Sequence, residues 1–403
     1  MSDLYIARQP IYDRQLSVYG YELLYRAGAA NSANVVDGDV ATSQVLVNAL
    51  MEIGLSELVG RSLAFINLTE RYILEGLPEV LAQAGVVLEI LEDVQPHAAI
   101  LESLANLKQQ GYVIALDDFV LHDDKLPLLA LADLVKIDLT TCTGERLEAQ
   151  VERLKSSNAK LLAEKVETRE EFERCKALGF DYFQGYFFSK PHLIKGKRTP
   201  TNRIAVLRLL ALLQNADLDF SDLETIIGQD VSLSYRILRY INSAQYYFAK
   251  KISSTKHAVT LLGIRTLRRW VTILTLSNLD DVKPLELMIT TLVRAKMCET
   301  LAPKLRIAPD SAFTVGLFST LDAFTDQPME EVLAQLPLAD DINTALTTRQ
   351  GPLGDLLQRV IAYEKGRWDD VATSGLDPAV QRDAYLQSIR FAQDISESLI
   401  ARK

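Results

Sequence analysis

Short apolar runs that alternate with amphipathic stretches are the feature of the first 190 residues that most limits the fold. The apolar runs lie at residues 63–66, 86–90, 113–116, 134–137 and 160–163. Amphipathic stretches lie between them at 99–110, 145–156 and 169–178. Strands that alternate with helices at this spacing are typical of βα units on a parallel sheet. The number of units favours a closed TIM-like barrel over a small open sheet.

Two further strand-like runs precede these units. They lie at residues 5–12 and 17–25, around a polar turn at 13–15. Runs of this length joined by a short polar turn are typical of a β-hairpin. The sequence therefore predicts that an antiparallel hairpin opens the barrel.

The pattern changes after residues 191–203, which carry two prolines, a glycine and several basic residues. Helical spacing of apolar residues then recurs at 206–213, 223–228, 232–242, 257–262, 264–276 and 284–301. Gly263 is predicted to separate two helices. We therefore expect two domains, an α/β TIM-like barrel over residues 1–197 and an all-α domain over residues 198–403.

Composition excludes several classes of function. The net charge is −10, which disfavours a non-specific nucleic-acid binder because phosphate contacts need clustered basic residues. Cys142, Cys175 and Cys298 are widely spaced and form no C-x-x-C pair, so neither a disulfide framework nor a zinc site is expected. No signal peptide and no membrane span are predicted. We expect a cytoplasmic protein with reduced thiols.

Polar residues of the kind that bind metal ions stand at the ends of the predicted strands. Glu22 lies within the early strand run, and the others follow or end later runs: Asn67, Glu89, Asp117, Asp118, Lys136, Asp138, Glu164 and Glu167. The carboxyl ends of strands in a parallel barrel meet at one rim, so these side chains are expected to converge. Clustered carboxylates repel one another unless divalent cations neutralise them, and oxygen ligands suit Mg²⁺ or Mn²⁺.

The neighbouring acids Asp117 and Asp118 could bind two metal ions about 3.5–4 Å apart, an arrangement used in phosphodiester hydrolysis. Lys136 could then orient a water molecule or neutralise charge on a phosphate. For any single acid, a helix cap or a solvated charge is the better explanation, and Asp138 is a candidate for such a structural role. At least five acids in register make coincidence a weaker explanation.

Residues 4–192 resemble the EAL domains, which are cyclic di-GMP phosphodiesterases. The resemblance rests on QPIYD (9–13), YELLYR (21–26), FINLT (65–69), LEILE (88–92), LDDF (116–119), VKID (135–138), AEKVET (163–168) and GFDYFQGYFFSKP (179–191). Leu23 stands where the signature has alanine, and Lys165 where the family has glycine. Many motifs in the right order make the resemblance specific.

The resemblance implies a role for each matching residue. Glu22, Asn67, Glu89 and Asp117 would bind one metal ion, with Asp117 bridging to a second ion beside Asp118. Glu22, Lys136, Glu164 and Gln184 would be catalytic, Glu164 also contacting the metal centre and Gln184 supporting the attacking water. Gln9, Arg26 and Glu167 would bind the ligand, Arg26 at a phosphate. The implied reaction cleaves one phosphodiester of cyclic di-GMP to give linear pGpG.

The segment after the paired aspartates departs from the family. It reads DDFVLHDDKLPLL and lacks the two glycines of the family loop, which helps to organise the second metal and the dimer. Val120 and Leu121 do not easily adopt positive φ, so the loop must take another path, and Asp123 or Asp124 could supply substitute acids. The departure keeps open a receptor that binds without turnover, or an interaction module that binds no nucleotide. A homodimer is a further option.

Residues 230–271 resemble the HDOD domain, relatives of HD phosphohydrolases that lack the metal-binding histidine and aspartate. The matching residues include Asp230, Leu233, Asn242, Ser243 and Gly263. No catalysis is therefore expected in this half, which would regulate the barrel or bind a signalling protein. The basic cluster of Arg265, Arg268 and Arg269 is better explained as a solvated helix face than as a nucleic-acid site.

Overall fold

A computed structural model describes two large parts of the chain and isolated residues between them. The described residues are 4–27, 54–76, 85–185, 187, 210, 213, 219, 222–223, 263–276, 284–334, 336, 338–373 and 375–400. The helices predicted between residues 206 and 262 lie almost entirely outside these ranges.

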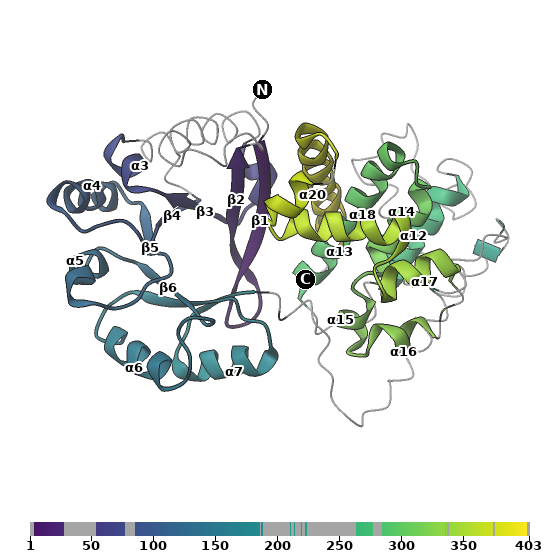
Figure 1. The fold of residues 1–403 in the computed structure, drawn as a ribbon. Helices are drawn as coiled ribbons and strands as arrows, with labels where there is room; N and C mark the ends of the chain where they lie inside the picture. The colour runs from purple at the N-terminus through teal and green to yellow at the C-terminus, as the bar shows by residue number, and fades with distance from the viewer. Residues whose placement is uncertain are drawn as a thin grey trace. The chain divides into compact units, whose positions relative to one another are not determined.

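Eight strands form a closed barrel in the order of the sequence (Figure 1). β1 (Leu4–Asp13) is antiparallel to both β2 (Val18–Ala27) and β8 (Tyr182–Gln184), and every other neighbouring pair is parallel. The remaining strands are β3 (Leu63–Leu68), β4 (Val86–Ile90), β5 (Val113–Leu116), β6 (Leu134–Asp138) and β7 (Lys160–Glu164). The TIM-like barrel and its opening hairpin are therefore confirmed.

A tight turn joins the two strands of the hairpin. The Asp13 carboxylate accepts hydrogen bonds from the backbone N–H groups of Gln15 and Ser17, at 2.8 and 2.9 Å. Leu16 adopts a φ of +63°. The aspartate side chain replaces backbone partners within the turn, which is why a short polar segment is sufficient to reverse the chain.

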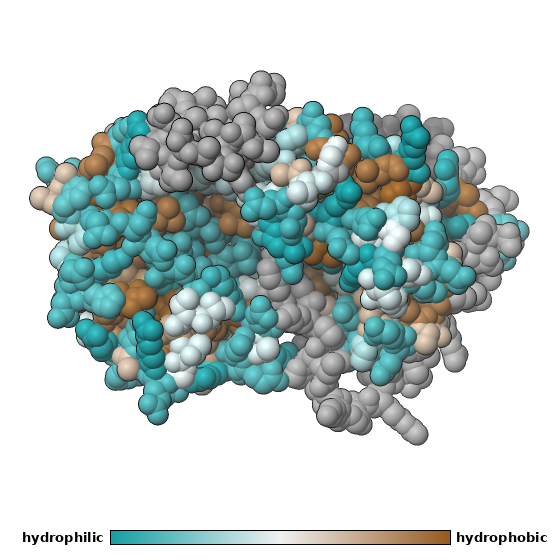
Figure 2. Space-filling view, viewed as in Figure 1, coloured by the Kyte–Doolittle hydropathy of each residue, from teal (hydrophilic) through white to brown (hydrophobic). Residues whose placement is uncertain are grey.

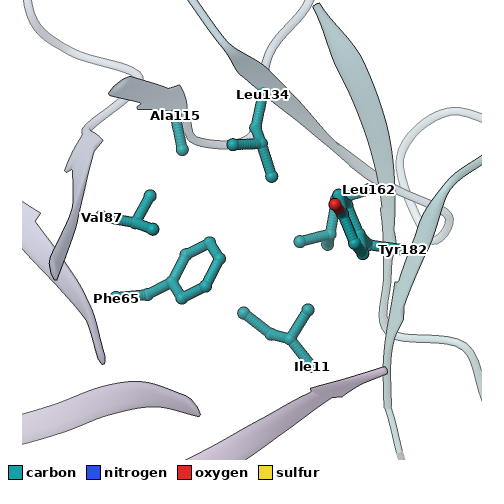
Figure 3. Close-up of a cluster of buried hydrophobic side chains, with 7 residues drawn as sticks. All are labelled: Ile11, Phe65, Val87, Ala115, Leu134, Leu162 and Tyr182. Carbon is teal, nitrogen blue, oxygen red and sulfur yellow. The ribbon is translucent and has the colours of Figure 1, made fainter. Parts of the chain in front are cut away.

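The barrel interior is built in layers, because alternate residues of each strand point inward. One layer is an apolar cluster whose side chains point toward one another in Figure 3. Its members are Ile11, Phe65, Val87, Ala115, Leu134, Leu162 and Tyr182. Two residues further along six of these strands come Asn67, Glu89, Asp117, Lys136, Glu164 and Gln184. The sequence period of two therefore places a polar layer directly above an apolar one.

Helices follow the barrel strands in the βα order that the sequence predicts. They are α2 (Leu55–Val59), α3 (Glu70–Leu74), α4 (Ala98–Gln109), α5 (Leu126–Leu129), α6 (Gly144–Leu154) and α7 (Arg169–Leu178). α7 begins with a reciprocal capping box, in which Thr168 Oγ1 accepts from the Glu171 N–H and the Glu171 carboxylate accepts from the Thr168 N–H. The cap fixes where the loop after β7 ends.

The described residues of the second half are helical, which confirms the all-α prediction there. The helices are α12 (Ile264–Leu276), α13 (Leu285–Leu301), α14 (Pro309–Phe318), α15 (Leu321–Thr325), α16 (Met329–Leu333), α17 (Asp340–Thr347), α18 (Gly351–Glu364), α19 (Trp368–Ala372) and α20 (Pro378–Ile400). None in the described ranges is long and apolar enough to span a bilayer.

The chain divides into two compact units, and the division does not follow the order of the sequence. One unit contains residues 1–190, 284–316 and 356–393, and the other contains 191–283, 317–355 and 394–403. The barrel therefore shares its unit with α13, α19, most of α14 and α18, and most of α20. Hydrophilic residues predominate on the face shown in Figure 2, with hydrophobic residues in scattered patches.

Candidate active site

A buried lysine lies at the centre of the polar layer. The Lys136 ammonium contacts four carboxylates, at 2.7 Å from Asp117, 2.8 Å from Glu89, 3.0 Å from Glu164 and 3.5 Å from Glu22. The four acids come from β2, β4, β7 and the end of β5. Lys136 and Glu89 are fully buried, with 0% of each exposed. The convergence of strand ends at one rim is therefore observed.

The Glu22 carboxylate has the most partners of the four. Asn67 Nδ2 donates to its Oε1 at 3.0 Å, and Gln184 Nε2 donates to its Oε2 at 2.7 Å. Gln9 lies directly opposite Glu22 in the β1–β2 pair, so the two side chains point to the same face. The hairpin strand is thus connected through side chains to β3, β6 and β8.

Burial and charge shift the pKa values of these groups in opposite directions. Burial lowers the pKa of Lys136, but the surrounding carboxylates outweigh it and raise this pKa well above its usual value. Burial raises the pKa of Glu89 well above its usual value and that of Glu164 to about 8, despite the attraction of Lys136. Burial alone would raise the pKa of Glu22, but Lys136 and the hydrogen bonds from Gln184 and Asn67 outweigh burial and lower this pKa. Lys136 therefore stays charged at neutral pH.

Several oxygens at this site lack a hydrogen-bond partner, although they are buried. They are Asn67 Oδ1, Glu89 Oε2, Glu164 Oε2 and Gln184 Oε1. Buried acceptors of this kind are normally satisfied, and a cation that takes hard oxygen ligands would satisfy them. Within the described ranges, no three acidic side chains are arranged as a ready-made set of metal ligands. The Lys136 ammonium lies between the carboxylates instead. The donor set fits a divalent cation that would bind the oxygens that Lys136 does not contact.

Two residues just after the ends of β5 and β7 have strained backbones. Asp118 has a φ of +42° and Lys165 a φ of +54°. Lys165 Nζ donates to Asp138 Oδ2 at 2.5 Å, and Thr140 donates to the other oxygen of Asp138. Burial and the nearby Asp117 raise the pKa of Asp118. Strain of this kind gathers at functional sites, and the glycine of the resembling motif is explained by the positive φ that Lys165 adopts here.

The altered loop after Asp118 is described over its whole length. None of residues 119–122 has positive φ, and the Phe119 carbonyl accepts a hydrogen bond from Gln150 Nε2 at 2.7 Å. A short 3₁₀ turn, η2 (Asp123–Lys125), then leads into α5. The expectation that Asp123 or Asp124 supplies substitute acids is wrong. Both are exposed, and Asp123 forms a solvent-exposed ion pair with Arg153, with Nη2 3.6 Å from Oδ1.

The three residues expected to bind the ligand lie in different parts of the barrel domain. Gln9 belongs to the polar layer through its register with Glu22. Glu167 is exposed in the loop after β7, where its N–H donates to the Glu171 carboxylate at 2.7 Å. The backbone of Arg26 pairs with Tyr5, and its side chain lies outside the described residues.

The ion pair of Lys165 with Asp138 was not predicted from the sequence. The available signal was the lysine that stands where the family motif has glycine.

The barrel is closed and its polar layer lies at the carboxyl ends of the strands. The protein therefore belongs to the class of barrel proteins whose functional sites lie at that rim. A model of the EAL domain matches residues 57–191, and a model of the HDOD domain matches residues 200–332. Gln9 and Glu22 precede the matched residues in the sequence, and it is the barrel that brings them beside matched residues such as Asn67 and Gln184. These matches, with the relatives below, show that the chain belongs to the family of proteins that join an EAL domain to an HDOD domain.

Two curated proteins are similar over almost the whole chain. The chain is 36% identical to the cyclic di-GMP phosphodiesterase CdgJ of Vibrio cholerae serotype O1, over 98% of this chain and 94% of that protein. It is 34% identical to YuxH of Bacillus subtilis strain 168, over 98% of this chain and 99% of that protein. Among solved structures, a standalone EAL protein from Vibrio cholerae O395 with bound c-di-GMP aligns with 47% of this chain and 92% of that one, with 26% identity and a TM-score of 0.37.

Proposed function

We propose that this protein hydrolyses one phosphodiester bond of cyclic di-GMP to give linear pGpG. The observation that carries the proposal is the group of four carboxylates around Lys136, together with its unsatisfied oxygens. The 36% identity to a cyclic di-GMP phosphodiesterase over 98% of the chain supports the choice of substrate.

The cation that we propose is Mg²⁺ or Mn²⁺, because every donor is a carboxylate or amide oxygen. Glu22, Asn67, Glu89 and Asp117 would hold one ion, and Asp117 with Asp118 and Glu164 would hold a second. When bound, the ions would polarise the phosphate and lower the pKa of the attacking water. Ion binding would also favour the ionised forms of Glu89 and Glu164, whose pKa values burial raises in the free protein.

The protein's own residues have distinct parts in the proposed reaction. Glu164 would take the proton of the attacking water as the water oxygen bonds to phosphorus. The opposite P–O bond would break, and the ribose oxygen would leave as an alkoxide that takes a proton from solvent, while Glu164 releases to solvent the proton it accepted. Lys136 stays protonated and offsets the negative charge that develops on the phosphate. Gln184 and Asn67 hold the Glu22 carboxylate in place, while Gln9, Arg26 and Glu167 would bind the nucleotide around it.

The test is to incubate the full chain with cyclic di-GMP and Mn²⁺ or Mg²⁺ and to measure pGpG by chromatography. Glu22→Gln should lower turnover more than about 100-fold, because it removes a ligand charge. Asp133→Asn is the matched control, since Asp133 is also a strand-terminal acid but precedes β6 at the other end of the barrel. The control should keep wild-type turnover.

Two other outcomes would replace the proposal. Binding of cyclic di-GMP without pGpG would indicate a receptor, which the altered loop after Asp118 would explain. Absence of binding with either cation would indicate a protein-interaction module. Each outcome is read directly from equilibrium dialysis of labelled cyclic di-GMP beside the turnover assay.

The remaining expectations accompany this proposal. We propose a regulatory HDOD part that binds a signalling protein, a boundary between the EAL and HDOD sequences near residue 197, and a cytoplasmic place of action. Cys142, Cys175 and Cys298 are free and buried, which agrees with a reducing compartment. Size-exclusion chromatography with light scattering would test whether the protein is a homodimer.

A further inference from the structure

The unpaired edge of β1 is covered by helices of the same compact unit. β1 pairs with β8 only through Ile11–Asp13, which leaves its preceding edge open. On that edge the Arg8 N–H donates to the hydroxyl of Tyr385 in α20, at 3.2 Å. Near the start of β1 the Tyr5 ring stacks on Trp368 of α19, with ring centroids 5.4 Å apart. These helices therefore take the place that a neighbouring strand would occupy.

A buried polar contact connects β2 to α13. The Tyr21 hydroxyl donates to Glu286 Oε2 at 2.8 Å, and the Arg8 guanidinium lies 4.2 Å from the centre of the Tyr21 ring. Arg8 is 8% exposed, Tyr21 5% and Glu286 4%. Arg8 also donates to the Leu58 carbonyl. Buried charges are costly unless their partners are in place, so this group tolerates few alternative positions of the strand against the helix.

Tyr21 is the residue immediately before Glu22. Successive side chains of a strand point to opposite faces, so Tyr21 points out to α13 while Glu22 points into the polar layer. The register of the hairpin agrees, with Tyr21 opposite Pro10 and Glu22 opposite Gln9. A change in the position of Tyr21 is therefore passed through one peptide unit to the Glu22 carboxylate.

α13 belongs both to the HDOD match and to the compact unit of the barrel. The match ends at residue 332, and α13 spans Leu285–Leu301. Further along α13, Arg294 forms a buried two-oxygen contact with Glu364 of α18, with Nη2 2.8 Å from Oε2. This contact joins α13 to α18 and involves no strand residue, so of these two contacts on α13 it is that of Glu286 that links the HDOD sequence to the strand that carries Glu22.

We propose that Glu286 is a positioning residue for the hydrolysis: through Tyr21 it holds β2 so that the Glu22 carboxylate is correctly placed, and helix α13 thereby controls the activity of the barrel. The inference rests on the proposed function for its meaning in catalysis. The placement of Glu22 by α13 can be tested whether or not the protein hydrolyses cyclic di-GMP.

The experiment uses the full chain and compares Tyr21→Phe, Glu286→Ala, their double variant and Glu286→Gln. Tyr21→Phe removes one hydroxyl, and Glu286→Ala removes its acceptor. We expect each single variant to lower kcat about 10-fold with KM within about threefold of the wild type, and to weaken Mn²⁺ binding in calorimetry about 10-fold. The double variant should lose no more than either single variant, because both remove one contact. Glu286→Gln keeps an oxygen acceptor and should retain kcat within about threefold.

The matched control is Glu364→Gln, which removes a buried carboxylate of the same helical layer whose partner is Arg294 rather than a strand residue. It should lower thermal stability without changing kcat or Mn²⁺ affinity. Hydrogen exchange of residues 18–27, which needs neither substrate nor metal, should become faster in Tyr21→Phe and Glu286→Ala only.

The inference is overturned if Tyr21→Phe and Glu286→Ala keep kcat, Mn²⁺ affinity and exchange within twofold of the wild type. It is equally overturned if Glu364→Gln has the same effects, because the helices would then contribute stability alone. A wild-type protein that makes no pGpG would refute the proposed function, whereas the Mn²⁺ and exchange measurements would still decide whether α13 places Glu22.

Discussion

At the scale of single residues, the site contains more acidic groups than basic groups to neutralise them. One ammonium, that of Lys136, lies among four carboxylates, so it cannot neutralise them all. Raised pKa values at Glu89 and Glu164 are the consequence, because burial then favours the protonated acids. The residue types at strand ends predicted that these groups would converge. They also predicted Lys136 at this rim, but not that its ammonium would contact four carboxylates, since spacing in the sequence does not fix the direction of a long side chain.

Replacement of Lys136 by methionine is expected to destabilise the metal-free protein by about 3–5 kcal/mol, because it leaves buried carboxylates without their cation. Saturating Mn²⁺ should restore much of this loss, since the added ion takes over the neutralisation. Urea denaturation with and without Mn²⁺ measures both effects. Lys160→Met is a control, because Lys160 ends near Tyr182 rather than among the acids. Equal stability of Lys136→Met and the wild type without metal would contradict the charge argument.

Glu286 gives the protein a predictable dependence on pH. Burial raises the pKa of Glu286 from 4.5 to about 7, against the opposing effects of Arg8 and the Tyr21 hydroxyl. A raised folded-state pKa in an acid means that the folded state binds the proton more tightly, so this contribution to stability is complete below pH 4.5 and is lost as the pH rises through about 7.

We therefore expect the free energy of unfolding of the wild type to fall by about 3 kcal/mol relative to Glu286→Gln as the pH rises from 4.5 to well above 7. The glutamine cannot ionise, so that variant isolates the effect of this one group. Chemical denaturation of both proteins at about five pH values measures the difference. A constant difference in stability across the series would show that burial does not raise the pKa of Glu286 in the folded protein.

At the scale of elements, the sequence predicted strands well where an apolar run is bounded by polar residues. The runs at 86–90 and 113–116 match β4 and β5 without a shift. β8 has only three residues, Tyr182–Gln184, and no periodicity can identify so short a strand. The contact of Tyr21 with Glu286 could not be predicted either, because it joins residues 265 positions apart and belongs to no motif.

The loop between β7 and α7 makes one glycine indispensable. Gly185 follows β8 with a φ of +150°, and a Cβ there would lie 2.0 Å from the Val166 carbonyl oxygen. Val166 N–H donates to the Gln184 carbonyl at 2.9 Å, so the two segments cannot separate without losing that bond.

Gly185→Ala should therefore destabilise the protein by about 3 kcal/mol or more and disturb Gln184, with a loss of turnover. Gly144→Ala is the matched control, since Gly144 also has positive φ, +57°, but nothing lies within 4 Å of the added carbon. The control should cost about 1 kcal/mol, the price of positive φ alone. Thermal denaturation of the two variants measures the contrast, and equal costs would contradict the close approach.

At the scale of the whole molecule, the compact units cross the division that composition predicts near residue 197. The unit with the barrel contains residues 284–316 and 356–393, so the chain leaves this unit and returns to it. The reason is the hairpin: β1 has an open edge that no barrel strand pairs, and Tyr385 and Trp368 cover it. A composition change marks where strands end, but it carries no information about which helices later cover them.

A chain of residues 1–197 should accordingly fail to fold as an independent domain. It would expose an open strand edge and the buried groups of Tyr5, Arg8 and Tyr21, and such edges promote association between chains. We expect aggregation in size-exclusion chromatography and loss of a cooperative thermal transition. The matched control is the full chain cut by a protease within residues 191–203, because both fragments are then present. A monomeric 1–197 chain that unfolds cooperatively and makes pGpG would show that the helices regulate a barrel they do not complete.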